Sequence, residues 1–344
     1  MKINKLIVPL NNSYYVNELP IHSTTLFGAL ANCYVKLYGE NSFNDFLAIF
    51  EGNDAKISSV FPFIRTKEKD LLFFPRPLIP YRSKDRENTN INRKKLDSIK
   101  WVSMGVLTKL SEKIIKINGQ LYHEFDYLNE CDSLSDNFLI LQDELSKNDK
   151  EEINNNLKIE ENVKTNVLTN RIGLENNMPF KIKCYRFVNS NELSKKYSIN
   201  MFFLEEWIEE DKKWIASKNL LIDEGLGGKK YIGGGHFIDI TTTEFAIEKD
   251  ENNEYGILCS AFIPSDVLCL DKIVYYDLGY DSGYITYFLP TKMKKSKLYY
   301  FKEGSVVKNG IKGSLIKQNY YNKKIVRYGK EYILPLGGKI NEKV

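Results

Sequence analysis

Residues 225–235 read GLGGKKYIGGG, a stretch with six glycines and two adjacent lysines, Lys229 and Lys230. It lies between an amphipathic helical segment and the strand-like run His236–Ile240. Because glycine has no Cβ, such a loop can adopt left-handed backbone angles and bring its N–H groups close to another molecule. Arrayed N–H groups form a concave site for anions, and the lysines add positive charge. The stretch therefore predicts a phosphate-binding loop between a helix and a strand.

Known nucleotide-binding loops differ from this stretch in order and in chemistry. A dinucleotide fingerprint places its glycines between a strand and a following helix, and a P-loop needs G-x-x-x-x-G-K-[ST] in the same setting. Here the helix comes first, and Gly228-Lys229-Lys230 lacks the hydroxyl residue that would bind magnesium. We therefore expect no ATP or NAD site. A long connection without a ligand remains the alternative.

The composition indicates a globular protein with room for two domains. The chain has 344 residues, of which 42% are hydrophobic. No apolar run approaches the roughly 20 residues that span a bilayer, and Leu6–Leu10 is too short for a signal peptide. We expect a cytoplasmic protein that does not enter a membrane.

Cysteine and histidine are too scattered for a local metal site. The sequence has five cysteines without a C-x-x-C pair, and its three histidines are far apart (Cys33, Cys131, Cys184, Cys259, Cys269; His22, His123, His236). This pattern supports neither a zinc site nor a disulfide framework. We expect buried thiols, no metal and no cofactor.

The net charge of +4 is small, so any nucleic-acid site must come from local clusters. Arg82–Lys95 has six basic residues and two acidic ones, while Lys292–Lys302 and Lys317–Lys330 interleave lysines with tyrosines. Basic residues bind phosphates and aromatic faces stack on unpaired bases, a combination that suits single-stranded RNA. The alternative for each cluster is a solvated charged edge.

The first part of the chain predicts a strand, a helix and two further strands. Lys2–Leu10 is strand-like, and a helix follows from His22-Ser23-Thr24, where a hydroxyl can cap the first turn, to Gly39 as a left-handed cap. Val60–Arg65 and Asp70–Phe74 are the next extended runs.

Residues 81–165 differ in composition from the segments before and after them, which indicates an insertion. Leu96–Glu112 reads as helical, and Asp143–Asn162 is charged and poor in aromatics, which predicts an exposed helix or a mobile linker. We expect a domain boundary at its end. Lys181–Asn189 and Tyr197–Leu204 then predict a strand pair, Glu205–Asp223 a helix, and His236–Thr243 and Tyr255–Ile263 strands, before tyrosine-rich strands to the end.

These elements predict an α+β protein made of tandem ferredoxin-like, RRM-like domains. Residues 1–165 would form the first domain, with a helical insertion over 81–165. Residues 166–344 would form the second domain, which carries the glycine-rich loop.

Two segments of the first half resemble a known family. Ile21–Leu30 (IHSTTLFGAL) resembles the I-H-S-D-T-L-F-G/S-A-[LI] signature of the fourth Csm subunit of type III-A CRISPR effector complexes, with Thr24 in place of the usual Asp. Ser58–Phe63 (SSVFPF) and Leu72–Leu78 (LFFPRPL) resemble the S-x-x-F-P-[YF] and x-P-[KR]-P elements of that family.

Three segments of the second half extend the resemblance to residues 20–335, with a weaker middle. Gly225–Phe237 resembles the family's G-x-G-G-[KR]-x-x-x-G-x-G-x-F loop, and Val326–Lys330 resembles its closing segment. Asn170–Ile172 resembles an R-N-x-I-D-R region, although Gly173 and Leu174 follow where a second Asp-Arg is usual. The glycine loop and the ferredoxin-like pair are shared by the whole RAMP superfamily.

The resemblance implies a non-catalytic, RNA-binding subunit of a type III-A CRISPR-Csm complex in antiviral defence. Such a subunit caps the 5′ handle of the crRNA. It also joins the large polymerase-like Csm subunit to the repeating backbone Csm subunit. Binding a fixed single-stranded tag needs phosphate contacts and base stacking, and no nucleophile or metal.

The candidate RNA-binding residues lie in four parts of the chain. They are His22, Ser23, Arg76, Asn170, Arg171, Gly227, Gly228, Lys229, Lys230, Gly233 and Gly235. Arg171 could instead pair with a nearby acid, and Arg76, between two prolines, could form a surface ion pair.

Two other functions remain open. An imidazole titrates near neutral pH, so His22 could act as the general base of a RAMP endoribonuclease that processes crRNA. The sequence offers no evident second histidine for such a reaction, which favours a structural or RNA-contacting His22. A protein scaffold whose RNA contact is incidental is the third function, and weak salt dependence of binding would distinguish it.

Overall fold

The structure is a computed structural model. It describes residues 1–51, 55–82, 93–124, 126–167, 179–189, 196–209, 211–248, 254–285, 293–320, 323–336 and 339–342. The predicted site residues Asn170 and Arg171 lie outside these ranges, as does most of the basic cluster 82–95.

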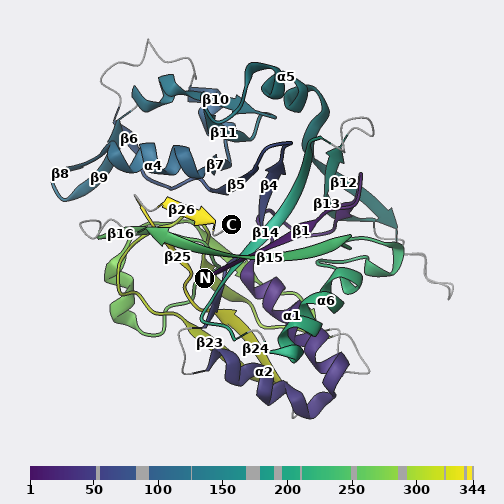
Figure 1. The fold of residues 1–344 in the computed structure, drawn as a ribbon. Helices are drawn as coiled ribbons and strands as arrows, with labels where there is room; N and C mark the ends of the chain where they lie inside the picture. The colour runs from purple at the N-terminus through teal and green to yellow at the C-terminus, as the bar shows by residue number, and fades with distance from the viewer. Residues whose placement is uncertain are drawn as a thin grey trace.

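One large mixed sheet forms the centre of the molecule (Figure 1). In the described residues it contains ten strands, nine of them in the order β10 (Cys131–Leu134), β11 (Phe138–Leu141), β7 (Trp101–Ser103), β5 (Asp70–Pro75), β4 (Phe61–Arg65), β14 (Ser198–Glu206), β1 (Lys2–Ile7), β15 (Asp239–Glu248) and β26 (Lys339–Glu342). The tenth, β3 (Lys56–Ile57), pairs with the end of β14. The β7–β11 pair is parallel, and the other pairs are antiparallel.

This sheet takes strands from both sides of the domain boundary expected at residue 165. β14 lies between β1 and β4, with Leu6 opposite Met201 and Phe61 opposite Phe202. Seven consecutive residues of β14, Ile199–Glu205, are buried, and five of them are apolar, as is typical of a strand covered on both faces. The protein is thus a mixed α/β protein, rich in sheet, whose central strand comes from the second half of the chain.

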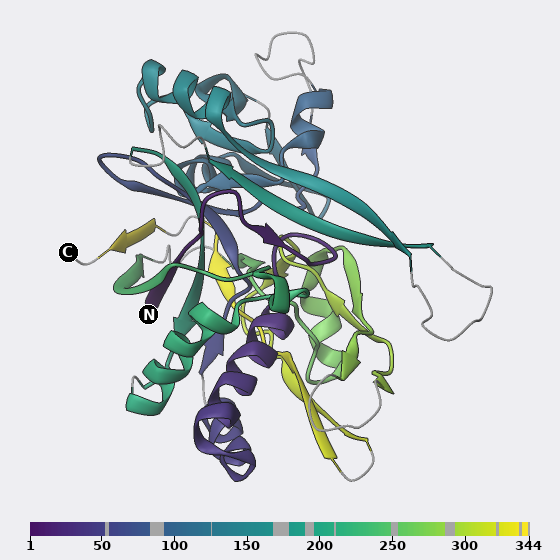
Figure 2. The same cartoon turned by 90° about the vertical axis from the view of Figure 1, so that its right-hand side faces the viewer.

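Fewer residues of the described chain lie in helices than in strands. The helices are α1 (Ser23–Tyr38), α2 (Phe43–Phe50), α3 (Arg93–Ser98), α4 (Met104–Glu112), α5 (Lys147–Asn156) and α6 (Lys212–Glu224), with 3-10 turns η1 (Glu40–Ser42), η2 (Asp126–Glu130), η3 (Lys230–Ile232) and η4 (Val267–Lys272). α1 and α6 lie side by side (Figure 2). None of the helices in the described ranges is long and apolar enough to cross a membrane.

An aromatic cluster holds α1, α2 and α6 against the C-terminal hairpin. Phe27 of α1 lies 5.2 Å from Phe50 of α2 and 5.4 Å from Tyr328, measured between ring centroids. Trp214 of α6 lies 6.0 Å from Phe50. All four rings are fully buried. Because Tyr328 lies on β24 (Lys323–Gly329), the cluster ties the first helices to the end of the chain.

The start of α1 differs from the prediction, whereas its end confirms it. His22 occupies the N-cap position without a side-chain cap, and the Ser23 hydroxyl instead accepts a hydrogen bond from the Ala261 amide at 3.1 Å. The predicted hydroxyl cap is therefore wrong, because a distant backbone group uses that oxygen. Gly39 ends the helix as predicted and has a positive φ of +86°, although its ψ of 167° is not that of a left-handed helical residue.

The insertion contains more strand than the sequence predicts. The helical run expected over 96–112 is interrupted by β7, where Trp101 and Val102 are buried and pair with Pro75 and Phe74 of β5. The expected exposed helix or linker over 143–162 is an exposed helix, α5, that continues directly into β12 (Leu157–Val167). β7 and β12 each form a ladder with another strand, which determines their extended structure.

A long hairpin extends from the body of the molecule (Figure 2). β12 pairs with β13 (Pro179–Asn189) along its whole length, and β2 (Ser13–Tyr14) pairs with the other edge of β13. The expected pairing of 181–189 with 197–204 is therefore wrong, since β14 takes its ladder partners from the first half of the chain.

The remaining strands form small sheets. They are β17 (Ile273–Tyr275), β22 (Val306–Lys308), β16 (Tyr255–Leu258) and β25 (Ile333–Pro335) in one sheet; β6 (Tyr81–Arg82), β9 (Gln120–Glu124) and β8 (Ile114–Ile117) in another; and the pairs β18 (Leu278–Asp281) with β21 (Leu298–Phe301), β19 (Tyr284–Ile285) with β20 (Met293–Lys294), and β23 (Ser314–Tyr320) with β24. The five cysteines are all free and buried, as expected.

Candidate functional site

The glycine-rich loop closes on itself at the end of α6. The Leu226 amide donates to the Gly235 carbonyl at 2.9 Å, and the Gly225 amide ends the helix by donating to Leu221 at 2.8 Å. Gly225 and Gly235 have φ of +68° and +80°, and a Cβ added at Gly235 would overlap the carbonyl oxygen of Leu226. Glycine is required at these positions because two stretches of the chain's own backbone touch.

The N-terminal segment around Tyr15 holds this loop in place. The Gly228 amide donates to the Tyr15 carbonyl at 2.9 Å, and the Gly235 amide donates to the Ser13 carbonyl at 3.1 Å. The Tyr14 hydroxyl donates to the His236 carbonyl at 2.8 Å. Residues more than 200 positions apart thus fix the loop's conformation.

These bonds occupy three of the four glycine amides that the sequence predicts to bind phosphate. The amides of Gly228 and Gly235 are occupied as described, and the Gly233 amide donates to the Lys230 carbonyl at 3.0 Å. An amide that already donates within the chain is not a free anion donor. These three amides therefore add no free donor for an anion, whereas the two lysine side chains do.

The two lysines lie in different surroundings. Lys229 has left-handed backbone angles, and its ammonium donates to the Tyr231 hydroxyl at 2.9 Å and lies 5.5 Å from the centre of that ring. Burial lowers the pKa of Lys230, while the charges of Cys33 and Glu224 oppose that shift. Both lysines are half-buried, Lys229 against Tyr231 and Lys230 near Cys33 of α1 and Glu224 at the end of α6.

Tyr231 is a site residue that the sequence analysis did not single out. Its side chain is 79% exposed, and Ile232 beside it is 62% exposed. The sequence contained a signal, since Tyr231 directly follows the two lysines. A cation next to an open aromatic face is an arrangement that can bind a phosphate and stack on a base.

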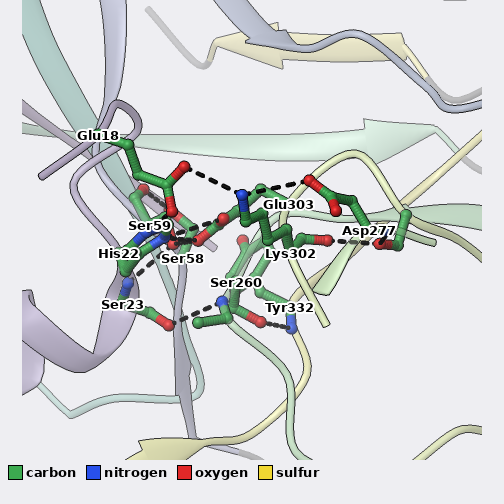
Figure 3. A network of polar contacts seen from close by, with 12 residues as sticks. Glu18, His22, Ser23, Ser58, Ser59, Ser260, Asp277, Lys302, Glu303 and Tyr332 are labelled. Atoms are coloured by element: carbon green, nitrogen blue, oxygen red, sulfur yellow. Dashed lines mark hydrogen bonds and ion pairs between the residues drawn. The ribbon is translucent and has the colours of Figure 1, made fainter. Parts of the chain in front are cut away.

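A second polar cluster surrounds His22 (Figure 3). The Nδ1 atom of His22 lies 3.0 Å from a carboxylate oxygen of Glu303, and its Nε2 atom lies 3.1 Å from Glu18. The Glu18 carboxylate also accepts from Lys302 at 3.0 Å, and Lys302 pairs with Asp277 at 3.2 Å. The cluster joins the start of α1 to the turn after β21.

This geometry makes His22 an imidazolium. Burial alone would lower its pKa, but the charge of Glu303 and the hydrogen bonds to both carboxylates raise the pKa to about 10. The hydrogen bond with His22 lowers the pKa of Glu18 to about 2. An imidazolium with both N–H groups paired cannot accept a proton at neutral pH, so the general-base hypothesis has no support in this geometry.

Ser23 has a structural role in place of the predicted RNA contact. Its side chain is fully buried, its amide donates to the Ser59 hydroxyl at 2.8 Å, and its own hydroxyl accepts from Ala261. The Ser59 hydroxyl in turn donates to Glu303. The serines near the start of α1 and before β4 therefore attach the C-terminal part of the chain to the first helix (Figure 3).

Arg76 lies near the same cluster, with its carbonyl oxygen close to Gly304. Its amide donates to the Lys100 carbonyl at 3.0 Å and its guanidinium donates to the Leu96 carbonyl at 2.7 Å. Two residues on, the Leu78 amide donates to the Gly304 carbonyl at 3.0 Å, next to Glu303. The expected surface ion pair is absent among the residues that the structure describes.

One segment, residues 11–21, joins the glycine loop to the His22 cluster. Its beginning holds the loop through Ser13 and Tyr15, its Glu18 pairs with His22 and Lys302, and Ile21 bridges to Val60. The structure therefore connects the predicted site residues of the loop, His22 and Arg76 through a continuous series of contacts.

The tyrosine-rich basic clusters are only partly open. Lys297 lies 4.1 Å and 4.8 Å from the ring centres of Tyr280 and Tyr299, both exposed. Arg327 is 3% exposed and donates to backbone carbonyls of Asp281 and Ser296. The first contact leaves cation and rings on the surface, whereas the second belongs to the core.

Comparisons with known proteins agree with this architecture. Residues 251–336 match the family model described as the CRISPR Csm4 C-terminal domain. The chain is 25% identical to the "CRISPR system Cms protein Csm4" of Methanocaldococcus jannaschii, across 98% of each chain.

Solved structures share the fold over the same extent. A chain of the Csm3–Csm4 subcomplex of the type III-A CRISPR-Cas interference complex has a TM-score of 0.66 and 22% identity, covering 97% of this chain and 99% of that one. A chain of the Csm1–Csm4 cassette in complex with cA4 has a TM-score of 0.54 and 16% identity, covering 98% of each. The chain is thus similar to Csm4 proteins over nearly its whole length, and residues 251–336 match the model of the Csm4 C-terminal domain.

Proposed function

We propose that this chain is the non-catalytic subunit that caps the 5′ handle of the crRNA in a type III-A Csm complex. It links the large polymerase-like subunit to the first repeating backbone subunit, as part of antiviral defence. Its relatives support this role, since solved structures name Csm4 together with Csm3 and with Csm1. The similarity to the curated Csm4 relative extends over 98% of both chains, which supports a role shared along the whole length.

The observation that carries the proposal is the tip of the glycine loop. Lys229 presents a cation and Tyr231 an exposed ring on a loop whose backbone is fastened to residues 13–15. A fixed cation beside a fixed stacking surface binds single-stranded RNA without ordering the loop on binding.

We expect further RNA contacts on either side of Lys229 and Tyr231. Lys230 would add a second cation on the loop, and Arg76 would contact the RNA beside the His22 cluster. Contacts by the loop glycines Gly227, Gly228, Gly233 and Gly235 would be made without the amides of the last three, which are already bonded. Contacts by His22, and by Asn170 and Arg171 outside the described residues, remain predictions from the sequence.

We also propose the finer organisation as two ferredoxin-like units, residues 1–165 and 166–344. The order β1, α1, β4 and the order β14, α6, β15 both run strand, helix, strand, which supports this division. The two units share the central sheet through β1 and β14.

The endoribonuclease alternative is the weaker one because His22 is held as an imidazolium by two carboxylates. Incubating the purified chain with repeat RNA in chelator tests it. Metal-independent cutting by the wild type that is lost in His22→Ala would contradict the non-catalytic assignment. We expect intact RNA with both proteins.

Purification of the tagged chain from its native host tests the proposed function as a whole. Sequencing of the bound RNA should show crRNA with the repeat-derived handle, and the large and backbone Csm subunits should co-purify. With the double variant Lys229→Ala and Lys230→Ala, the handle of the crRNA should lose its protection, while the large and backbone Csm subunits should still co-purify. Recovery of neither crRNA nor Csm subunits with the wild type would refute the proposal.

A further inference from the structure

A cavity of about 200 Å³ lies beside the segment Arg76–Tyr81. Its floor is formed by the buried side chains of Leu96, Leu110, His123 and Tyr127. Leu78, which is 37% exposed, lies at its rim. The elements around it, α4, β6 and β9, lie together at one end of the molecule (Figure 1).

Three rings line this cavity. The ring centroid of His123 lies 5.8 Å from that of Tyr81 and 5.6 Å from that of Tyr127, each pair nearly edge to face. Burial lowers the pKa of His123 to about 4. Hydrogen bonds to the backbone of Glu124 and Ile79 oppose this shift, and the positive charge of Arg76 adds to it. His123 is therefore a neutral aromatic ring at neutral pH, and the lining is largely apolar and aromatic.

Arg76 places a guanidinium at the cavity, and it has no carboxylate partner among the residues that the structure describes. The Arg76 guanidinium donates to the Leu96 carbonyl at 2.7 Å, which uses one of its five N–H groups. The remaining N–H groups of the planar guanidinium can donate to a ligand, and the aromatic side chains can stack on it. This combination favours a planar ligand with hydrogen-bond acceptors.

The walls are preformed. The Arg76 amide donates to Lys100, the Leu78 amide to Gly304, and the His123 amide to the Pro80 carbonyl at 3.1 Å. Pro77 and Pro80 stiffen the same segment. A cavity fixed in this way does not have to be ordered when a ligand enters, which favours binding.

We propose that this cavity binds one unpaired nucleobase, with Arg76 as the residue that recognises its acceptor edge. Typical small-molecule sites have volumes of about 300–1,000 Å³. Because this cavity is smaller, a single ring system fits into it and a larger ligand does not. Arginine pairs bidentately with the N7 and O6 acceptors of guanine, which makes guanine the expected base.

The base can come from a bound RNA strand or from a free nucleotide. The RNA source rests on the proposed function, since Arg76 is joined to the glycine loop through the His22 cluster and residues 11–21. The free-nucleotide source does not depend on that function. The experiment therefore has one arm for each source.

The first arm titrates the full chain with guanosine and adenosine 5′-monophosphates by calorimetry. We expect guanosine monophosphate to bind more tightly. Leu110→Phe fills the cavity and should weaken this binding about tenfold, the loss that corresponds to one stacked base. The matched control is Leu107→Phe, on the same helix but not lining the cavity. Arg76→Lys keeps the charge and should remove the preference for guanine.

The second arm irradiates the wild-type chain with handle RNA that carries 6-thioguanosine or 4-thiouridine at single positions. Mass spectrometry should map a crosslink to Tyr81, His123 or Tyr127. Because this arm uses the wild type, it does not depend on whether a variant folds.

The outcomes separate the two proposals. A crosslink in the cavity, or nucleotide binding that Leu110→Phe weakens and Leu107→Phe does not, supports the nucleobase site. Handle RNA that binds through Lys229 and Lys230, without a crosslink in the cavity and without nucleotide binding, overturns the nucleobase site and leaves the proposed function intact. Nucleotide binding in a chain that binds no RNA refutes the function and keeps the site.

Discussion

The imidazole of His22 lies 3.0 Å from the carboxylate of Glu303, although 281 positions separate the two residues in sequence. The Glu303 side chain is 1% exposed and that of His22 is 14% exposed. The contact therefore joins the start of the first helix to the C-terminal part of the chain through a buried ion pair. It also explains why a histidine at this position need not serve catalysis.

The pH dependence of stability should reveal this pair. The folded-state pKa of His22 is about 10, above its ordinary value of 6.5, so its stabilisation is complete below about pH 6.5 and is lost as the pH rises toward 10. We expect His22→Gln to cost about 3 kcal/mol of unfolding free energy at pH 6.5, and less at pH 10. Chemical denaturation at the two pH values measures this.

The matched control is His236→Gln, which should leave the same pH dependence in place. Glu18 changes the stability at acid pH, in the opposite direction to His22. Its folded-state pKa of about 2 is below its ordinary value of 4.5. The contribution of Glu18 to folding stability is therefore complete above pH 4.5 and is lost as the pH falls toward 2. A difference between wild type and His22→Gln that does not change between pH 6.5 and 10 would contradict the ion pair.

Gly235→Ala should destabilise the folded chain by about 1–3 kcal/mol. The residue has φ of +80°, and the added Cβ would overlap the Leu226 carbonyl. Thermal unfolding measures the change. The control is Gly28→Ala in α1, where nothing lies within 4 Å of the added Cβ and about 0.5–1 kcal/mol should be gained. Equal effects of the two substitutions would show that the loop is not held as described.

A buried ion pair between α6 and the sheet should be sensitive to the loss of one partner. The Lys218 ammonium lies 3.1 Å from Glu205 and 2.9 Å from the Asn4 side-chain oxygen, with both charged side chains at most 3% exposed. Lys218→Met leaves a buried carboxylate without its cation and should cost about 3–5 kcal/mol. Denaturant unfolding is the measurement.

Two further variants test whether the cost comes from the unpaired charge. Lys158→Met removes an exposed pair with Glu160 and should cost less than about 1 kcal/mol. Lys218→Met combined with Glu205→Gln should recover much of the loss, since no buried charge remains. A double variant as unstable as Lys218→Met alone would argue against this explanation.

Tyr231→Ala should weaken binding of handle RNA about tenfold without altering its salt dependence. The ring is 79% exposed and neutral, so its removal takes away stacking and leaves the phosphate-binding lysines in place. Tyr231→Phe keeps the ring and should bind nearly as the wild type. Fluorescence anisotropy at several salt concentrations measures both. Unchanged affinity in Tyr231→Ala would remove this ring from the RNA site.

Local signals in the sequence predicted several elements correctly. The helical spacing that ends at Gly39 corresponds to α1, and the glycine loop does lie between a helix and a strand. The extended runs at 60–65 and 70–74 correspond to β4 and β5. Each of these depends on residues close together in the chain.

The errors all involve distant partners. Trp101 and Val102 lie inside a helical pattern, yet they form a strand because β5 offers them a ladder. The partner of the Ser23 hydroxyl is an amide 238 positions away. The acceptors of the Gly228 and Gly235 amides are likewise distant residues, Tyr15 and Ser13, so the sequence could not show that these two amides are occupied.

For the candidate site, the sequence identified the lysines of the loop and could not show their surroundings. Tyr231 was visible in the sequence, but its exposure was not. The cavity at Arg76 unites residues from segments around positions 76–81, 96–110 and 123–127, which only the fold brings together.

The salt dependence of RNA binding tests the central claim most directly. The slope of log Kd against log salt is measured for handle RNA with the wild type and with Lys229→Ala combined with Lys230→Ala. The control, Lys212→Ala with Lys213→Ala, removes the same charge at the other end of α6, about 20 Å away. In the loop variant alone, we predict weaker binding and a slope lower by about 0.7 for each phosphate that the loop no longer binds. An unchanged slope in the loop variant would contradict the claim that this loop holds RNA.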